Sequence, residues 1–248
     1  MTVTDGDENR RAELAAALAG VRDRIAAAAR AANRDPAGIR LLAVTKTRPA
    51  IDAALLTDIG VVDLAENREQ EGAAKAVELA GLRPTARVRW HLVGRLQRNK
   101  ARSLSRWAAE VQSVDSARLA EALARGVAAA RAAGERAGSL DVLIQASIDG
   151  DPDRGGCPIA ELPGLADRVV RSSDLRLRGL MAVAPLAMEP AAAFELLAAA
   201  ADRLRRDHPG ATELSSGMSG DLEQAIAHGS TCVRVGTALL GERPLASP

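Results

Sequence analysis

Aromatic residues are almost absent from this sequence, which has one phenylalanine, two tryptophans and no tyrosine among 248 residues. Hydrophobic residues nevertheless make up 47% of the chain, which is ample for a core. Alanine, leucine and valine must therefore fill that core, as suits helices packed closely against a sheet. Without tyrosine, the chain also has no phenol that could act as an acid or a base.

Cysteine, net charge and long apolar runs are scarce as well. Cys157 and Cys232 lie far apart and form no metal-ligand pattern, so we expect reduced thiols and no metal site. The net charge of +1, with acids and bases mixed, argues against nucleic-acid and membrane partners. No apolar run approaches the roughly 20 residues that span a bilayer, and no signal segment precedes the acidic start. We expect a cytoplasmic protein.

Lysine is also rare, and its placement points to chemistry. The chain has three lysines, Lys46, Lys75 and Lys100, and arginine supplies the other basic residues. Lys46 directly follows the apolar run 41–45, as expected of a residue at the end of a buried strand. A lysine amine can lose its proton and attack a carbonyl, whereas a guanidinium stays protonated. Lys46 is therefore a candidate Schiff-base nucleophile, with a solvated or carboxylate-paired lysine as the alternative.

Hydrophobic periodicity predicts eight strands that alternate with helices. The strands are expected at 41–45, 61–65, 88–93, 110–113, 140–147, 177–182, 212–215 and 232–235. Helices are expected at 9–32, 49–58, 67–80, 97–106, 116–134, 158–171, 190–206 and 219–228.

This alternation predicts the α/β class, with parallel strands and right-handed crossovers. Eight units in about 240 residues fit a closed (β/α)8 TIM barrel with an extra N-terminal helix. An open sheet is the alternative, because 110–113 and 212–215 are weak strands. We predict one domain at 9–248 after a disordered tail at 1–8.

Two glycine-containing loops follow the last two predicted strands. Residues 215–221 read Ser-Ser-Gly-Met-Ser-Gly-Asp and lead into a helix, with Ser219 as the expected N-cap, and Gly236-Thr237 follow the final strand. Backbone N–H groups at a helix start bind phosphate, and barrel enzymes often bind phosphate in these two loops. Ordinary capping is the alternative for either loop alone. With Lys46 on the neighbouring first strand, the loops favour a phosphorylated aldehyde such as pyridoxal 5′-phosphate, and a class I aldolase without a cofactor is the alternative.

Several segments together resemble the YggS/PROSC family of pyridoxal-phosphate-binding homeostasis proteins. They are Ala43-Val44-Thr45-Lys46, Glu66-Asn67, Trp90-His91-Leu92-Val93-Gly94, Gly179-Leu180-Met181, 214–221 and 228–241. The resemblance covers nearly the whole chain and implies a single barrel similar to the N-terminal domain of bacterial alanine racemase. It also implies that Asn67 lies beside the cofactor and that Gly217 belongs to the same site.

The resemblance further implies the roles of five residues. Lys46 would form the internal aldimine with pyridoxal 5′-phosphate. Arg234 would face the pyridine nitrogen. The phosphate would be held by Ser215, Gly236 and Thr237.

Whether the chain is an enzyme depends on its proton-transfer groups. A racemase needs a second acid or base opposite the lysine, for which alanine racemase uses a tyrosine, and this chain has none. His91 could substitute, but a buried histidine satisfied by its neighbours is favoured. Arg234 cannot accept a proton, so the pyridine would stay unprotonated and a poor electron sink. We predict no catalytic residue.

The predicted function is therefore that of a monomeric carrier in vitamin B6 homeostasis. It would store or buffer the cofactor, or hand it to apo-enzymes that depend on pyridoxal phosphate. An amino-acid racemase of the same fold is the alternative, and a vestigial activity of that kind is left open.

Three further residues, Lys75, Lys100 and Cys157, are interpreted from their sequence surroundings. Lys75 is expected on the surface, paired with Glu71 or Glu78 at helical spacing. Lys100 begins a predicted helix, as part of a solvated basic face or as a second ligand contact. Cys157 is predicted to be a loop thiol.

Overall fold

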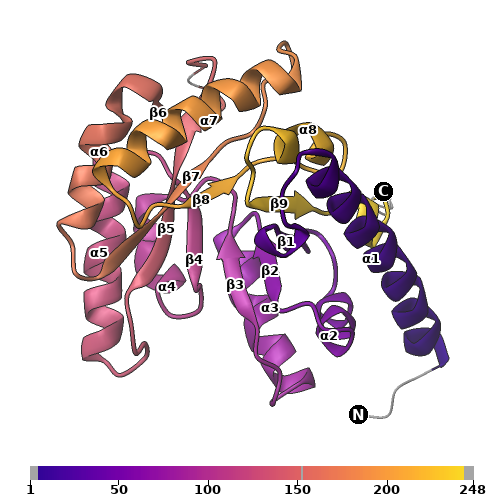
Figure 1. The fold of residues 1–248 in the computed structure, drawn as a ribbon. Coiled ribbons are helices and arrows are strands. Elements are labelled where there is room, and N and C mark those ends of the chain that lie inside the picture. The colour runs from indigo at the N-terminus through magenta and orange to yellow at the C-terminus, as the bar shows by residue number, and fades with distance from the viewer. Residues whose placement is uncertain (1–4, 152, 243–248) are drawn as a thin grey trace.

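Eight parallel strands close into a barrel in the computed structural model, which describes residues 5–151 and 153–242 (Figure 1). The barrel strands are β1 (Arg40–Val44), β2 (Asp63–Glu66), β3 (Arg89–Leu92), β4 (Glu110–Val114), β5 (Leu140–Ser147), β7 (Leu175–Met181), β8 (Glu213–Ser215) and β9 (Cys232–Val235). Pairing of β1 with β9 and of β4 with β5 completes the ring. A two-residue strand, β6 (Cys157–Pro158), adds to the end of β5.

The eight predicted strands are all present, and their ends agree with the prediction to within two residues. The two weak strands form because each has a hydrogen-bonded neighbour on both sides. β4 lies between β3 and β5, and β8 lies between β7 and β9. The closed barrel is confirmed, and the open-sheet alternative is wrong.

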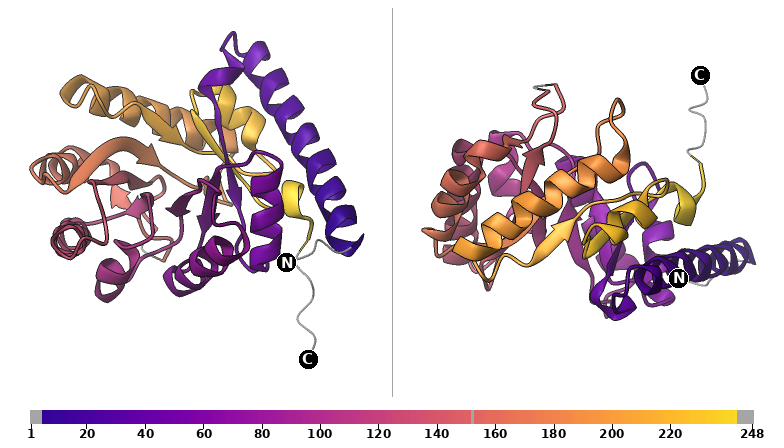
Figure 2. Two further views of the ribbon diagram at one scale, coloured as in Figure 1. Left: turned by 90° about the horizontal axis from the view of Figure 1, so that it is seen from below. Right: turned by 45° about the horizontal axis from the view of Figure 1, so that its top comes forward.

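Helices surround the strands in both views of Figure 2. They are α1 (Asp5–Ala31), α2 (Ala50–Asp58), α3 (Glu69–Leu82), α4 (Ala101–Leu104), α5 (Ala117–Ala132), α6 (Leu162–Val170), α7 (Pro190–Asp207), α8 (Leu222–Ala227) and α9 (Thr237–Leu240). Short 3-10 turns η1 (Pro36–Gly38), η2 (Arg98–Lys100) and η3 (Ile159–Glu161) precede β1, α4 and α6. In the part of the chain that is described, no helix is both long and apolar enough to cross a membrane.

Helix boundaries differ from the prediction by up to four residues, and the predicted helix 158–171 begins as an α-helix only at Leu162, after β6 and η3. Three further differences involve α1, α4 and α9. Residues 5–8, predicted to belong to a disordered tail, form the first turn of α1, and residues 1–4 lie outside the described residues. The predicted helix 97–106 is divided into η2 and the four-residue α4. α9 was not predicted, because four residues are too few to show a helical period.

The N-terminal helix covers one side of the barrel, where it packs against α2, α8 and α9. Leu14, Leu18, Val21 and Ile25, which carry the predicted apolar stripe, are each at most 5% exposed. Burial of this stripe holds α1 to the domain.

Side chains inside the barrel form layers along its axis. On β1, alternate residues Arg40, Leu42 and Val44 belong to successive layers, as the period of two requires. Arg40 lies at the N-terminal end among carboxylates, and Leu42 packs against Ala65 and Cys232 in the middle. Val44 borders an open pocket at the C-terminal end. The charged layer and the pocket therefore occupy opposite ends of the barrel.

Candidate functional site

A pocket of about 410 Å³ opens at the C-terminal ends of the strands. Five of the seven predicted site residues line it, namely Lys46, Asn67, Arg234, Gly236 and Thr237. They meet because residues that follow parallel strands gather at the same end of a barrel.

Lys46 follows β1 and is half-buried in the pocket wall. Its amine makes no hydrogen bond and no ion pair with any residue that the structure describes. The alternative of a carboxylate-paired Lys46 is therefore not supported. An unpaired amine at a pocket wall is available to condense with a carbonyl.

A buried lysine holds the backbone next to Lys46. Lys75 Nζ donates hydrogen bonds to the Thr45 carbonyl at 2.7 Å and to Glu66 Oε1 at 2.6 Å, and it lies 3.4 Å from Glu71 Oε1. The prediction that Lys75 lies on the surface is wrong, since it is 5% exposed, although the predicted proximity to Glu71 is confirmed. Burial raises the pKa of Glu66, with the hydrogen bonds from Lys75 and Thr45 opposing that rise.

The residue after Lys46 is held as well. Glu71 Oε1 accepts a hydrogen bond from the Thr47 N–H at 2.5 Å. Thr47 has a φ of 63°, in the left-handed region that a β-branched residue rarely adopts. Contacts from α3 therefore fix the backbone on both sides of Lys46. The sequence showed Glu71 only as a helix-spaced partner of Lys75, so this arrangement was missed.

Arg234 reaches the pocket from inside the barrel, and its guanidinium is fixed on two sides. Nη1 donates to Ser215 Oγ and Nη2 donates to the Ala182 carbonyl, both at 2.8 Å. Ser215 Oγ donates in turn to Gln112 Oε1 at 2.7 Å. Burial lowers the pKa of Arg234, but a guanidinium remains charged at neutral pH. Ser215 is fully buried and is not among the residues that line the pocket, and its hydroxyl supports Arg234, so its contact with the phosphate stays a prediction.

In the loops that follow β8 and β9, four backbone N–H groups of pocket-lining residues have no hydrogen-bond acceptor among the described residues. They belong to Ser219, Gly220, Gly236 and Thr237. Because unsatisfied N–H groups carry partial positive charge, this part of the wall suits an anion such as a phosphate.

The loop after β8 is shaped by its own side chains. Gly217 has a φ of 88°, and a Cβ there would meet an α8 side chain at 2.5 Å, so Gly217 serves the turn and lies outside the pocket lining. The prediction that Ser219 is the N-cap of α8 is wrong, because Asp221 holds that position. The Ser219 Oγ instead accepts a hydrogen bond from the Ala238 N–H, which links the loop after β8 to α9. Asp221 Oδ1 accepts from the Met218 N–H at 2.6 Å, so this carboxylate is turned onto its own loop.

Asn67 depends on a glycine for its position. A Cβ built at Gly94 would lie 2.1 Å from the Asn67 carbonyl oxygen and 2.4 Å from its Oδ1. Asn67 therefore occupies the space that any larger residue at position 94 would take.

His91 lies in the charged layer at the far end of the barrel and is fully buried. Its Nε2 is 2.8 Å from Asp63 Oδ1, and its Nδ1 is 3.0 Å from Glu110 Oε1. Burial lowers the pKa of His91, but hydrogen bonds to the two carboxylates outweigh burial and raise it overall. The interpretation of a buried histidine satisfied by its neighbours is confirmed.

The pocket can hold an aldehyde and an anion but offers few groups for proton transfer. Among the described residues that line it, none is His, Asp, Glu or Cys. Lys46 supplies the amine, and Arg234 supplies a fixed positive charge.

The sequence and the fold of this chain are similar to those of known proteins. Residues 17–244 match the family model described as "Alanine racemase, N-terminal domain". The "Pyridoxal phosphate homeostasis protein" of Mycobacterium tuberculosis (strain ATCC 25618 / H37Rv) is 50% identical over 97% of this chain and 96% of its own length. PipY of Synechococcus elongatus PCC7942, solved with PLP bound, is 33% identical, with a TM-score of 0.77 over 92% of this chain and all of PipY.

A more distant structure shares the fold alone. Alanine racemase from Corynebacterium glutamicum is 17% identical, with a TM-score of 0.65. The match spans 92% of this chain but 62% of the racemase.

Proposed function

The chain belongs to the pyridoxal phosphate homeostasis protein family, and from that premise we propose that it binds pyridoxal 5′-phosphate (PLP) in the pocket at the C-terminal end of the barrel. In this proposal the Lys46 amine condenses with the aldehyde carbon of PLP and water leaves. The protein stores, buffers or hands over the cofactor and does not turn over a substrate efficiently.

One observation carries the proposal: an unpaired lysine amine shares a pocket with four unsatisfied backbone N–H groups. The aldehyde and the phosphate arm of PLP are attached to adjacent ring atoms. Lys46 follows β1, and Gly236 follows β9, the strand paired with β1. The aldehyde and phosphate arm are thus neighbours in PLP, and Lys46 and the N–H groups at Gly236 and Thr237 are neighbours in the protein.

The charge and side chains around the pocket support binding without efficient catalysis. The guanidinium of Arg234 donates hydrogen bonds and cannot accept one from a protonated pyridine nitrogen, so it favours the unprotonated ring, which is a weak electron sink. His91, the one strand-end histidine considered as a second base, is enclosed by Asp63 and Glu110 at the other end of the barrel. A two-base racemization would therefore lack its second base.

Borohydride reduction followed by peptide mapping tests the attachment site. Reduction fixes the C=N bond as a secondary amine, so a phosphopyridoxyl mass is expected on the peptide that carries Lys46. Lys46→Arg is expected to abolish both the adduct and the visible absorbance band of the holo-protein. Lys100→Arg, which changes a lysine outside this pocket, is the matched control and is expected to keep both. An adduct on Lys75 or Lys100 in the wild-type protein would refute the assignment.

A racemase assay tests the absence of efficient catalysis. Holo-protein is incubated with single amino-acid enantiomers, and optical rotation is followed against free PLP. Rates close to those of free PLP are expected. Turnover far above free PLP would establish the racemase alternative in place of the carrier.

A further inference from the structure

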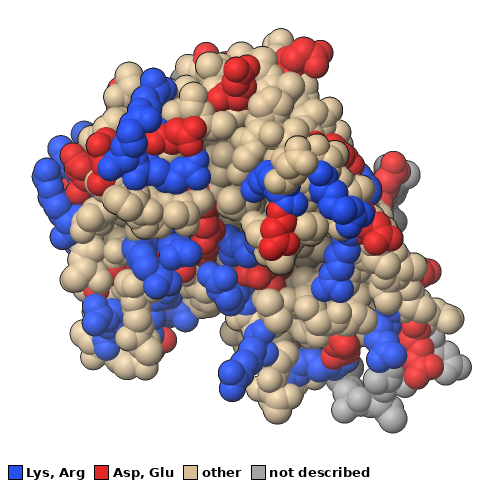
Figure 3. Space-filling view, viewed as in Figure 1, with Lys and Arg blue, Asp and Glu red and all other residues tan. Residues whose placement is uncertain are grey.

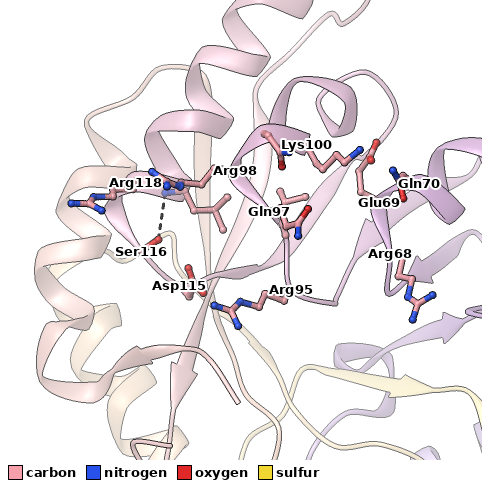
Figure 4. A pocket seen from close by; sticks show the side chains of 13 residues that line it. Arg68, Glu69, Gln70, Arg95, Gln97, Arg98, Lys100, Asp115, Ser116 and Arg118 are labelled. Atoms are coloured by element: carbon pink, nitrogen blue, oxygen red, sulfur yellow. Dashed lines mark hydrogen bonds between the residues drawn. The ribbon is translucent and has the colours of Figure 1, made fainter. Parts of the chain in front are cut away.

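A second, larger cavity lies beside the cofactor pocket and has a volume of about 1150 Å³ (Figure 4). It is lined by the segments 68–70, 95–100 and 115–119, which follow the C-terminal ends of β2, β3 and β4. Asn67 lines the cofactor pocket and Arg68 lines this cavity, so the two openings adjoin on the same end of the barrel. We call this cavity the basic groove.

Five basic residues line the basic groove, namely Arg68, Arg95, Arg98, Lys100 and Arg118. None of their side chains makes an ion pair or a hydrogen bond with any residue in the described ranges. The lining has two acidic residues, Glu69 and Asp115. Glu69 is buried and accepts a hydrogen bond from Ser103, so Asp115 is the one carboxylate in the described part of the lining without such a bond. The groove therefore carries an excess of positive charge with no internal partner.

Arginines at the opposite, N-terminal end of the barrel are paired with carboxylates. Arg40 bonds to Glu110 and Glu213, and Arg176 bonds to Asp141. On the face shown in Figure 3, basic side chains likewise lie beside acidic ones over much of the surface. The gathering of five unpaired basic side chains in the basic groove is a local excess of positive charge, since the net charge of the whole chain is +1.

The spread of the basic side chains over the surface favours an extended anionic partner over a single phosphate group. Figure 4 shows the guanidinium groups of Arg68, Arg95 and Arg118 at separate places around the cavity. A smaller hollow of about 220 Å³ continues from Arg98 and adds Arg102 and Arg125. Positive charge thus extends along the outer surface beyond the reach of a single small anion.

The side chains of the groove favour an acidic polypeptide over a nucleic acid. No aromatic residue is present among the described residues of the lining, so bases would have no ring on which to stack. The two tryptophans pack against each other, with ring centroids 6.3 Å apart. Carboxylates, in contrast, pair with guanidinium groups directly.

We propose that the basic groove binds an acidic segment of a protein that exchanges cofactor with the adjoining pocket. The exchange partner rests on the proposed function, whereas binding of an acidic segment rests on the groove alone. A partner held there would stand next to Asn67, at the opening through which the cofactor enters and leaves.

Fluorescence anisotropy with a labelled peptide of alternating glutamate and glycine tests this proposal on the full-length holo-protein. The groove variant carries Arg68→Gln, Arg95→Gln, Arg98→Gln and Arg118→Gln. The control variant carries Arg11→Gln, Arg87→Gln, Arg171→Gln and Arg203→Gln, which change four exposed arginines elsewhere by the same total charge. The groove variant is expected to bind the peptide at least about tenfold more weakly, and the control variant within about twofold of wild type.

Salt and alternative probes complete the test. Wild-type affinity for the peptide is expected to fall as salt is added, and a peptide with glutamine in place of glutamate is expected not to bind. Equal losses in the groove and control variants would overturn the proposal. Tighter, groove-dependent binding of single-stranded DNA or of tripolyphosphate would also overturn it, in favour of those ligands.

The visible absorbance band separates this proposal from the proposed function. The groove variant is expected to keep the band of bound cofactor, since none of its four changes is in the cofactor pocket. Loss of peptide binding with the band intact supports the groove proposal. Absence of the band in the wild-type protein would refute the proposed function without affecting the peptide result.

Discussion

Lys75 Nζ lies 2.7 Å from the carbonyl oxygen of Thr45 and donates a hydrogen bond to it. A buried side chain of α3 thereby holds the residue that precedes Lys46. The same ammonium bonds to Glu66 Oε1, so the charge of each residue is balanced by the other inside the protein.

Lys75→Met is expected to lower the free energy of unfolding by about 3–5 kcal/mol, because it leaves the Glu66 carboxylate buried without its cation. The double variant Lys75→Met/Glu66→Gln removes both charges and is expected to recover much of this loss. Lys100→Met is the control, with a change within about 0.5 kcal/mol. Urea unfolding measures all three, and equal stability of the Lys75 and Lys100 variants would contradict the buried pair.

Ser215→Ala is expected to weaken cofactor binding, because Arg234 Nη1 loses its acceptor and the guanidinium is free to shift. Unfolding should also become easier by about 1–3 kcal/mol. Ser105→Ala provides a matched control, since Ser105 is equally buried and bonds to the Ala101 carbonyl away from the pocket. Cofactor titrations followed by absorbance compare the two variants, and similar affinities would argue against the positioning role.

Gly94→Ala is expected to displace Asn67, since the added Cβ would lie 2.1 Å from the Asn67 carbonyl oxygen. The free energy of unfolding should fall by about 1–3 kcal/mol, and cofactor affinity should fall with it. Gly81→Ala in α3 meets no atom within 4 Å and should be neutral or stabilising by up to about 1 kcal/mol. Unchanged cofactor affinity in Gly94→Ala would show that the loop at Asn67 adapts.

The stability conferred by His91 is expected to depend on pH. Its folded pKa is raised, so its contribution is complete below the unfolded value of about 6.5 and is lost as pH rises through the folded value. The gap in unfolding free energy between wild type and His91→Gln should therefore be larger near about pH 6 than near about pH 9. His228→Gln is the control, because His228 bonds to the Gln224 carbonyl and not to a carboxylate. A difference in unfolding free energy that widens as pH rises would contradict a raised pKa of His91 in the folded protein.

Cys157 is expected to resist alkylation in the folded protein. Burial, with Glu161 and Asp115 nearby, raises its pKa to about 11, so the thiolate is scarce at neutral pH. Reaction with iodoacetamide at about pH 8 should be roughly a hundredfold slower than for an exposed thiol. Mass spectrometry of native and urea-unfolded protein measures both cysteines, and rapid native labelling of Cys157 would contradict this expectation.

Local sequence patterns were sufficient for the strand and helix order. Apolar runs such as 140–147 and the helical stripe of Leu14, Leu18 and Val21 report burial within a few neighbouring residues. Lys46 and Gly236 could be placed at strand ends for the same reason. Once a parallel barrel was expected, those ends had to meet at one mouth.

The sequence by itself determined the alternation of eight strands with helices and the lysine and glycine positions at the strand ends. The tertiary structure decided what each polar group contacts: Lys75 is buried against Glu66, Ser215 supports Arg234, and the loop residues around Arg68 and Arg95 form the basic groove. Periodicity records only whether a side chain faces the core. Partners distant in the chain, such as Ser215 and Gln112, are set by closure of the barrel, which no local pattern encodes.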